Sequence, residues 1–268
     1  MKTIILFICF TLSIKAQSNN GQVKYTYIFN NFKNFSLLIF NKDKSIYKIQ
    51  LVKSNNKIEI QKINTEDDKI NLNINLDNNA PNSHGLYTNL NEEYIIENLF
   101  LAKNLKSQEY DTLFVKEKTN NIKWKLLLET KVINSFLCQK ATCDFRGRSY
   151  FVWFTNEIPV SLGPWKLNGL PGLILEANDS KNQLQFYAEK ITLNTNKSID
   201  EKNFFNMNYI TPKESREKLL ASLEFISDEI SQKIRSSLPR GVVSTTNKTN
   251  AKIIDDNSQM EINYDDIK

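Results

Sequence analysis

The sequence predicts a mainly β (α+β) fold, in which a bent antiparallel sheet or open half-barrel carries one long C-terminal helix. Apolar and polar residues alternate with period two through the first 190 residues, which is typical of antiparallel strands with one dry face and one wet face. A single helical pattern follows after residue 194. A chain of 268 residues can bury a core that is stable without disulfides, so we expect one β-rich domain over residues 17–240.

The first sixteen residues have the pattern of a signal peptide. Lys2 gives the N-terminus a positive charge, and residues 4–14 form an apolar run. Ala16 is a small residue at a suitable cleavage point. The run is too short to cross roughly 30 Å of hydrocarbon, which takes about 20 residues. We therefore expect an exported protein, periplasmic or extracellular, that is not an integral membrane protein.

Alternating residues mark the expected strands. The clearest pattern covers residues 70–76, where Asn occupies the positions between apolar residues. Similar patterns cover residues 23–29, 47–51, 122–128 and 184–188. No helix-length pattern separates these strands, so a meander is favoured over βαβ units.

Two segments lack alternation and predict strands that are buried on both faces. Residues 150–154 are apolar throughout and should lie centrally in the sheet, and residues 173–175 should form a second such strand. Between residues 145 and 150, Arg146-Gly147-Arg148 reads as a hairpin turn with Gly147 in the left-handed region.

The C-terminal helix has both a start and a stop signal. Thr211 and Glu214 form a capping box, with Pro212 at the first helical position, and Pro239 and Gly241 end the pattern. We expect a helix over about residues 212–238, followed by a polar, loosely ordered tail at 241–268. Its apolar stripe, which should pack on the sheet as core, consists of Leu219, Leu223, Ile226, Ile230 and Ile234.

Residues 153–179 crowd rigid and flexible backbone residues into one place. The dipeptides Gly163-Pro164 and Pro171-Gly172 each pre-set a turn. Aromatic side chains beside such turns are typical of ligand pockets, although core packing explains them equally well. We expect Phe151 and Phe154 in the core and leave Trp165 as either core or half exposed. The candidate binding surface comprises Trp153, Glu157, Pro159, Gly163, Pro164, Trp165, Gly169, Leu170, Pro171 and Gly172, with Arg146 and Arg148 nearby.

Several kinds of catalytic site are excluded by composition. His84 is the only histidine, and its neighbours at 79–85 have loop composition, so we expect it to be a solvated loop residue. A zinc site of three histidines is impossible, and no phosphate-binding loop is present. We accordingly assign no catalytic, metal or cofactor-binding residues and expect no cofactor.

Charged side chains near the turns leave some alternatives open. A carboxylate-dependent hydrolase would need convergence in a cleft, with perturbed pKa values, among Asp144, Glu157, Glu176 and Asp179. Arg146 and Arg148 could bind an anion, but residues flanking a hairpin glycine are more often solvated.

The charge of the chain bears on its possible partners, and its cysteines bear on a possible disulfide. Without Lys2 and Lys15 the 35 basic residues fall to 33, against 30 acidic ones, which leaves a formal charge of +3. The charges are interleaved and not gathered in a stripe, so nucleic acid is not expected as a partner. Cys138 and Cys143 fall on opposite faces of a straight strand, so a disulfide would require a bulge, and otherwise they are buried thiols.

The hexapeptide at 169–174, GLPGLI, resembles the signature of the GLPGLI family of secreted bacterial proteins. The resemblance continues in order through residues 38–41, 45–47, 124–126, 130–133, 138–142, 145–148, 153–155 and 158–159. Cys143 departs from it, so no conserved disulfide is carried over. The resemblance implies a secreted or periplasmic protein of two-membraned bacteria, often associated with outer-membrane transport genes, with an uncharacterised role and no catalytic residues to transfer.

These observations favour a non-catalytic envelope protein that binds an apolar ligand or an outer-membrane transport protein. The alternatives are a secreted hydrolase that uses carboxylates and a structural envelope component with no concave apolar pocket. The expected half-barrel is similar to periplasmic lipoprotein carriers, but that analogy concerns the fold and not the function.

Overall fold

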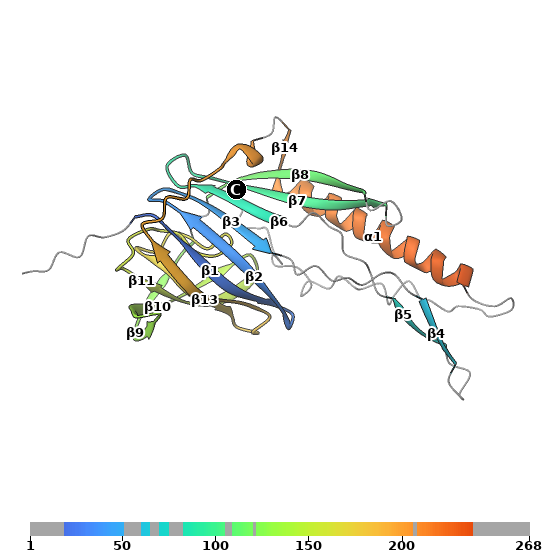
Figure 1. Cartoon of the computed structure of the whole chain (residues 1–268), viewed down its shortest axis with the longest axis horizontal. Helices are drawn as coiled ribbons and strands as arrows, with labels where there is room; N and C mark the ends of the chain where they lie inside the picture. Colours follow the sequence, from blue (N-terminus) through green and yellow to red (C-terminus); the bar gives the residue numbers. More distant parts are fainter. Residues whose placement is uncertain are drawn as a thin grey trace, which may run out of the picture.

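The computed structural model of the chain describes residues 19–50, 60–64, 70–74, 83–104, 109–119, 122–205 and 208–237. It confirms a mostly β fold built on one open sheet with one long helix (Figure 1). The expected signal peptide at 1–16 and the expected tail at 241–268 lie outside the described residues. No helix in the described part of the chain combines the length and the apolar character needed to cross a membrane.

The elements follow the predicted order of strands first and helix last. In chain order they are β1 (Gly21–Phe29), β2 (Phe32–Phe40), β3 (Lys44–Gln50), β4 (Ile60–Asn64), β5 (Ile70–Ile74), β6 (Ser83–Asn89), β7 (Tyr94–Asn104), β8 (Glu109–Lys118), β9 (Lys125–Ile133), β10 (Phe136–Phe145), β11 (Arg148–Thr155), β12 (Leu173–Asp179), β13 (Leu184–Leu193), the 3-10 helix η1 (Lys202–Phe204), β14 (Tyr209–Ile210) and α1 (Pro212–Ser237).

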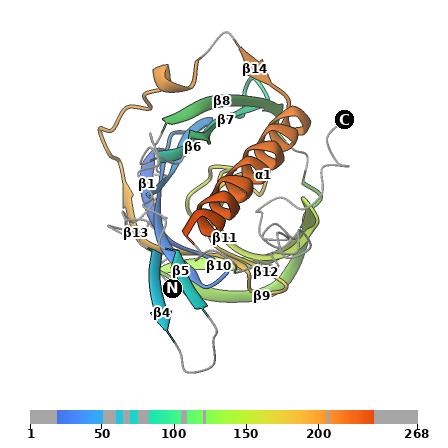
Figure 2. The same ribbon diagram turned by 90° about the vertical axis from the view of Figure 1, so that its right-hand side faces the viewer.

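Twelve strands form one sheet in the order β14-β8-β7-β6-β3-β2-β1-β13-β12-β11-β10-β9. Every neighbouring pair is antiparallel except β14 with β8. Figure 2 shows these strands curving around an incomplete ring, with β8 and β9 on either side of the gap. Strands β4 and β5 pair separately as a hairpin. The sheet is therefore an open half-barrel, one of the two forms expected, and its antiparallel strands confirm what the alternation predicted.

Apolar residues are buried on both faces of part of the sheet. The concave side holds the main core, where Tyr25, Phe154 and Phe186 are among the fully buried side chains. On the convex side a smaller cluster includes Tyr87 and Phe204. The chain after β13 crosses that face, and there the Tyr87 hydroxyl donates to the carboxylate of Glu201. Strands β3, β6 and β7 consequently have two dry faces, where alternation predicted one.

Helix α1 begins as the sequence predicts. The Thr211 backbone N–H donates to the Glu214 carboxylate at 2.7 Å, and the Glu214 N–H donates to the Thr211 hydroxyl at 3.2 Å, which completes the capping box. The helix packs on β7 and β8 and does not lie across the whole sheet (Figure 1). Of the predicted stripe, Leu219 is half buried, while the other four side chains lie outside the described ones.

Two strand predictions need correction. Residues 150–154 belong to β11, which is interior in the sheet but alternates in burial, so Phe151 is 42% exposed while Phe154 is fully buried. The predicted dry face of residues 122–128 is wrong for Leu126 and Leu128, which lie exposed on β9 at the edge of the sheet, whereas Ile122 and Trp124 pack against the core. Residues 173–175 are all buried, as predicted.

The two described cysteines are free and buried. Strand β10 pairs with β11 without a register shift from Gln139 to Phe145, so Cys138 and Cys143 stand on opposite faces, as their odd spacing predicted. Burial raises the pKa of the Cys138 thiol to about 11 and that of Cys143 to about 12. Both behave as small apolar core residues.

The loop between β11 and β12, residues 156–172, folds back into the concave side of the sheet. We call it the motif loop. Its backbone is held by hydrogen bonds from Gly169 N–H to Ser161 C=O at 3.0 Å and from Ile174 N–H to Leu162 C=O at 3.0 Å. The Tyr25 hydroxyl on β1 donates to Ile174 C=O at 2.6 Å. The loop is thus an internal part of the core and not a surface excursion.

Gly172 is required by close packing. A Cβ atom there would lie 2.1 Å from the backbone oxygen of Thr155. We expect Gly172→Ala to lower the free energy of unfolding by about 3 kcal/mol, because rigid backbone would have to shift. Gly169→Ala is the matched control: its φ is +93°, but a Cβ there would meet Trp124 at an ordinary contact distance of 3.6 Å, so the cost should be about 1 to 2 kcal/mol. Urea denaturation of both variants measures this, and equal losses would contradict the packing argument.

Candidate functional site

A chain of buried charges ties the motif loop to the opposite part of the sheet. Lys166, 1% exposed, places its Nζ 2.8 Å from Glu97 Oε2 on β7 and 2.6 Å from Glu117 Oε1 on β8. Arg146, at the β10–β11 turn, also pairs with Glu117, and His84 on β6 lies 2.6 Å from Glu97 Oε1 through its Nε2. Five charged or titratable groups therefore join the loop, the turn and three strands.

The buried cations in this group of side chains favour the ionised form of the carboxylates. Burial alone would raise the pKa of Glu97, but Lys166 and His84 lower it from 4.5 to about 2. Because the pKa of Glu97 is lower in the folded protein than in the unfolded chain, its ionised carboxylate stabilises the fold above about pH 4.5. This stabilisation is lost as the pH falls toward 2. The formal charges of these five groups sum to zero when His84 is neutral. The groups hold the motif loop against the sheet and do not form an accessible reactive site.

The expectation that His84 is a solvated loop residue is wrong. His84 lies on β6, opposite Ile49 of β3, with a side chain that is 20% exposed and paired with Glu97. Ser83, His84 and Gly85 nevertheless belong to a strand, because they pair with Gln50, Ile49 and Lys48 of β3.

The expectation that Arg146 and Arg148 are solvated is also wrong. Both are buried, at 1% and 4% exposure. Arg148 donates to Asp179 Oδ2 at 2.6 Å, and the other carboxylate oxygen of Asp179 accepts the backbone N–H groups of Gln183 and Leu184. Gly147 has φ +78° and Arg146 φ +52°, which confirms the predicted tight hairpin turn.

The four carboxylates considered for hydrolysis do not form one group. Asp179 pairs with Arg148, Glu176 pairs with Lys131 at 2.7 Å, Asp144 accepts from Ser149, and Glu157 accepts the Leu137 N–H at 2.8 Å. Each is held by a different partner: Arg148 and Ser149 lie on β11, Lys131 on β9 and Leu137 on β10. Among the described residues, no group of three His, Cys, Asp or Glu side chains is placed to hold a metal ion.

Most of the predicted binding surface lies inside the protein. Trp165 is core: it is 3% exposed, has φ +55° and packs on Phe145 with 5.7 Å between ring centroids. Pro159 is half buried, whereas Glu157, Gly169 and Pro171 are exposed. Four other residues of the predicted surface are also buried: Gly163, Pro164, Leu170 and Gly172.

Trp153 lies on the other face of the sheet from the motif loop. It is half buried on β11, and the Nζ of Lys131 sits 4.5 Å from its ring centroid. Lys131 also pairs with Glu176, the β12 neighbour of Trp153. These contacts form a compact ion pair over an aromatic ring, away from the other predicted residues.

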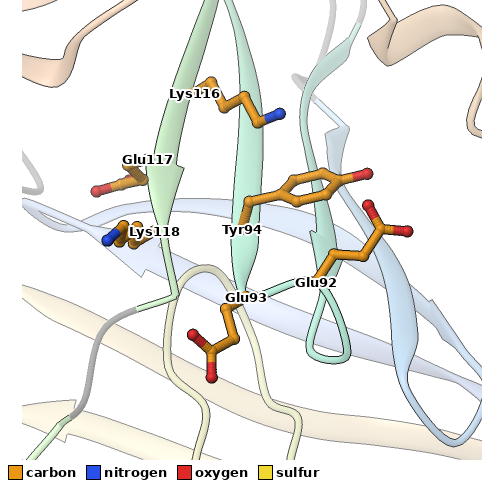
Figure 3. A pocket seen from close by; sticks show the side chains of 6 residues that line it. All are labelled: Glu92, Glu93, Tyr94, Lys116, Glu117 and Lys118. Carbon is orange, nitrogen blue, oxygen red and sulfur yellow. The ribbon is translucent and has the colours of Figure 1, made fainter.

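One hollow lies where β7 begins and β8 ends. It measures about 340 Å³ and is lined by Glu92, Glu93, Tyr94, Lys116, Glu117 and Lys118. Figure 3 shows Lys116, Tyr94 and Glu92 on one side and Glu117 on the other. The Lys116 ammonium lies 4.3 Å from the Tyr94 ring centroid. Charges of both signs line this hollow, so it favours no single sign of ligand.

Exposed apolar side chains gather at the free edge of the sheet. Strand β9 pairs with β10 on one side and is the last strand of the sheet. Leu126 pairs with Ala141 and Val132 with Leu137, so these side chains face the concave side. We name this surface the β9 lip, and it comprises Leu126 (50% exposed), Leu128 (96%), Val132 (68%) and Leu137 (57%).

A mainly apolar pocket opens beside the β9 lip. It measures about 380 Å³ and is lined by Thr130, Leu137, Cys138, Gln139, Phe154, Asn156 and Glu157. Phe154 and Leu137 are its bulky apolar walls, while Glu157, at the start of the motif loop, brings a carboxylate to its rim. Of the residues predicted from sequence, Glu157 alone lines this pocket.

Sequence reasoning missed Glu97, Glu117 and Lys166. Glu97 interrupts the apolar run YIIENLF, and Lys166 stands between Trp165 and Leu167, so a lone charge among large apolar residues was the available signal. Such a charge needs a buried partner of opposite sign, but the sequence does not say which one.

A short segment of the chain matches a family model, and this match carries no activity. Residues 146–176 match the family described as "Protein of unknown function (Porph_ging)". The matched span contains Arg146, Lys166 and the hexapeptide 169–174. No curated protein matches the chain.

Among solved structures, the chain is similar to PNGF-II in crystals of space groups P21 and C2. The TM-scores are 0.53 and 0.50, and the sequence identities are 17% and 18%. The likeness covers 76% of this chain but 34% and 33% of those chains, so this chain spans about a third of their length. At this identity the likeness concerns the fold alone.

Removing the central lysine should destabilise the fold strongly. Lys166→Met leaves Glu97 and Glu117 buried without it, so we expect the free energy of unfolding to fall by about 3 to 5 kcal/mol at pH 7. The control is Lys140→Met, whose ion pair with the exposed Glu129 should change stability little. Urea denaturation monitored by tryptophan fluorescence measures both, and a Lys166→Met protein as stable as the control would contradict a fastening role.

Proposed function

We propose that this protein is a non-catalytic, exported binding protein of the GLPGLI family that holds an apolar ligand at the β9 lip. The observation that carries the proposal is the pocket of about 380 Å³ beside exposed leucine and valine side chains. Apolar side chains that remain in water on a folded protein mark interaction sites when they are contiguous.

The position of the pocket supports binding over a structural role. It lies on an element pair, β9–β10, whose concave face is completed by Phe154 and by the start of the motif loop. Because buried charges fasten the loop, the pocket wall is pre-formed, which lowers the ordering cost of binding. A purely structural envelope component would gain nothing from exposed apolar walls.

The geometry gives no comparable support to a hydrolase. Glu157, the carboxylate at the pocket rim, accepts the Leu137 backbone N–H, and Asp144, Glu176 and Asp179 have partners elsewhere. A pair of carboxylates flanking one substrate bond is the arrangement that such chemistry needs.

Export is proposed from the pattern of residues 1–16 and from the resemblance of 169–174 to the GLPGLI signature. The periplasm or the outside of the cell then places the pocket where lipids and outer-membrane transport proteins occur. We favour an apolar small molecule as ligand because the pocket is the size of one acyl or aromatic group.

The binding proposal is tested with a neutral apolar dye, N-phenyl-1-naphthylamine, and with lauric acid as competitor. We expect saturable dye fluorescence that lauric acid displaces, and at least a tenfold weaker affinity in Leu137→Asp, since a charge then enters the apolar wall. Leu137 is 57% exposed, so the substitution should not unfold the protein.

The control variant is Phe32→Asp, at an exposed apolar residue of β2. Its dye affinity should equal that of the unaltered protein. Absence of saturable binding, or equal loss in both variants, would contradict a ligand site at the β9 lip. In that case, specific capture of an outer-membrane transport protein from an envelope extract would move the role of the lip to a protein partner.

A further inference from the structure

The β9 lip is an unfinished surface. The sheet stays open between its end strands, β14 and β9, and β9 has no second neighbouring strand in the described part of the chain. Leu128 on this strand is 96% exposed, which is the largest exposure of any bulky apolar residue among those described. Apolar side chains left in this state on an edge strand need a cover to leave water.

The backbone of β9 does not offer a long continuous edge for another strand. The register with β10 shifts between Thr130, opposite Gln139, and Leu126, opposite Ala141, so three residues of β9 face Lys140 alone. A bulge of this kind bends the strand and turns Leu128 outward. Side chains, and not a complete ladder of hydrogen bonds, must therefore carry a contact here.

Opposite charges mark the two ends of the lip. Lys125 is exposed beside Leu126, and Glu157 is exposed beside Leu137, to whose N–H it is bound. A second copy laid antiparallel brings Lys125 of each copy to Glu157 of the other, whereas a parallel copy brings like charges together. Between these ends Glu129 is exposed on β9 but is paired with Lys140 at 3.2 Å, so the two ends set the complementarity of the lip with itself under a two-fold axis.

We propose that two copies of this chain associate antiparallel through their β9 lips, with Leu126 and Leu128 of each copy covering the apolar pocket of the other. In this arrangement the exposed leucines of one copy meet Val132 and Leu137 of its partner, which line or flank the pocket. The pocket is open in one copy and gains its missing wall from the second. The role of this dimer, which is to close the ligand pocket, rests on the proposed function. The contact between the two copies rests on the β9 lip alone.

The contact area sets the expected strength. Four exposed apolar side chains and two ion pairs at the rim make a small interface, which predicts a weak dimer with a dissociation constant of roughly 10 µM. Rim ion pairs add selectivity of orientation more than affinity.

Sedimentation velocity over a micromolar concentration series tests the association. We expect a reversible monomer–dimer equilibrium, and at least a tenfold weaker association in Leu128→Lys. Phe32→Lys, which places the same charge on an exposed apolar residue of β2, should associate like the unaltered protein. A protein that stays monomeric through the series, or a dimer that Leu128→Lys leaves unchanged, overturns the proposal.

A charge exchange tests the antiparallel arrangement. Lys125→Glu and Glu157→Lys should each weaken the dimer, and the double variant should recover most of the association because the opposite charges again meet. Failure of the double variant to recover, with each single variant folded by circular dichroism, overturns the antiparallel arrangement.

Dye binding separates this proposal from the proposed function. A monomer that still binds dye at Leu137 overturns the dimer and leaves the ligand pocket standing. A dimer that binds no dye supports self-association and removes the ligand. If both hold, dye affinity should rise with dimer fraction, since the second copy closes the pocket.

Discussion

The interaction on which this structure depends is the buried contact of Lys166 with Glu97 and Glu117. A sheet that curls without closing has no ladder of hydrogen bonds between its two ends, so something else must hold its curvature. The motif loop crosses the concave side and carries one ammonium group to two adjacent strands. Taking these charges out of water is costly unless all are paired, so the arrangement tolerates little displacement.

The fastening explains why the turn-rich segment is rigid. Gly172 packs against the backbone of Thr155, and Trp165 adopts a left-handed backbone conformation to reach Phe145. Strain at Trp165 persists because the surrounding core fixes it. The span matching the family of unknown function, 146–176, includes the loop, the hairpin Arg146 and the lysine, so it coincides with the internal fastening and not with the exposed β9 lip.

Local chemistry predicted much of the fold. The capping box at Thr211, the hairpin at Gly147 and the buried strand after Gly172 each depend on neighbours in the sequence. What could not be predicted depends on distant residues: His84 meets Glu97 across a strand pair, and Arg146 meets Glu117 from another part of the sheet. Leu126 and Leu128 read as core because alternation does not tell an edge strand from an interior one. The pocket could not be predicted either, because its walls come from β9, β10, β11 and the motif loop, and the sequence does not show that these elements meet.

The central claim is that the motif loop is fixed inside the half-barrel and holds the curvature of the sheet through the contacts of Lys166 with Glu97 and Glu117. Native-state hydrogen exchange of the loop amides tests it most directly. The amides of Val160, Leu167 and Gly169, which donate to Ile158, Pro164 and Ser161, should be protected as strongly as those of β1 and β12. Exchange of these three amides at the rate of an exposed loop would contradict the account.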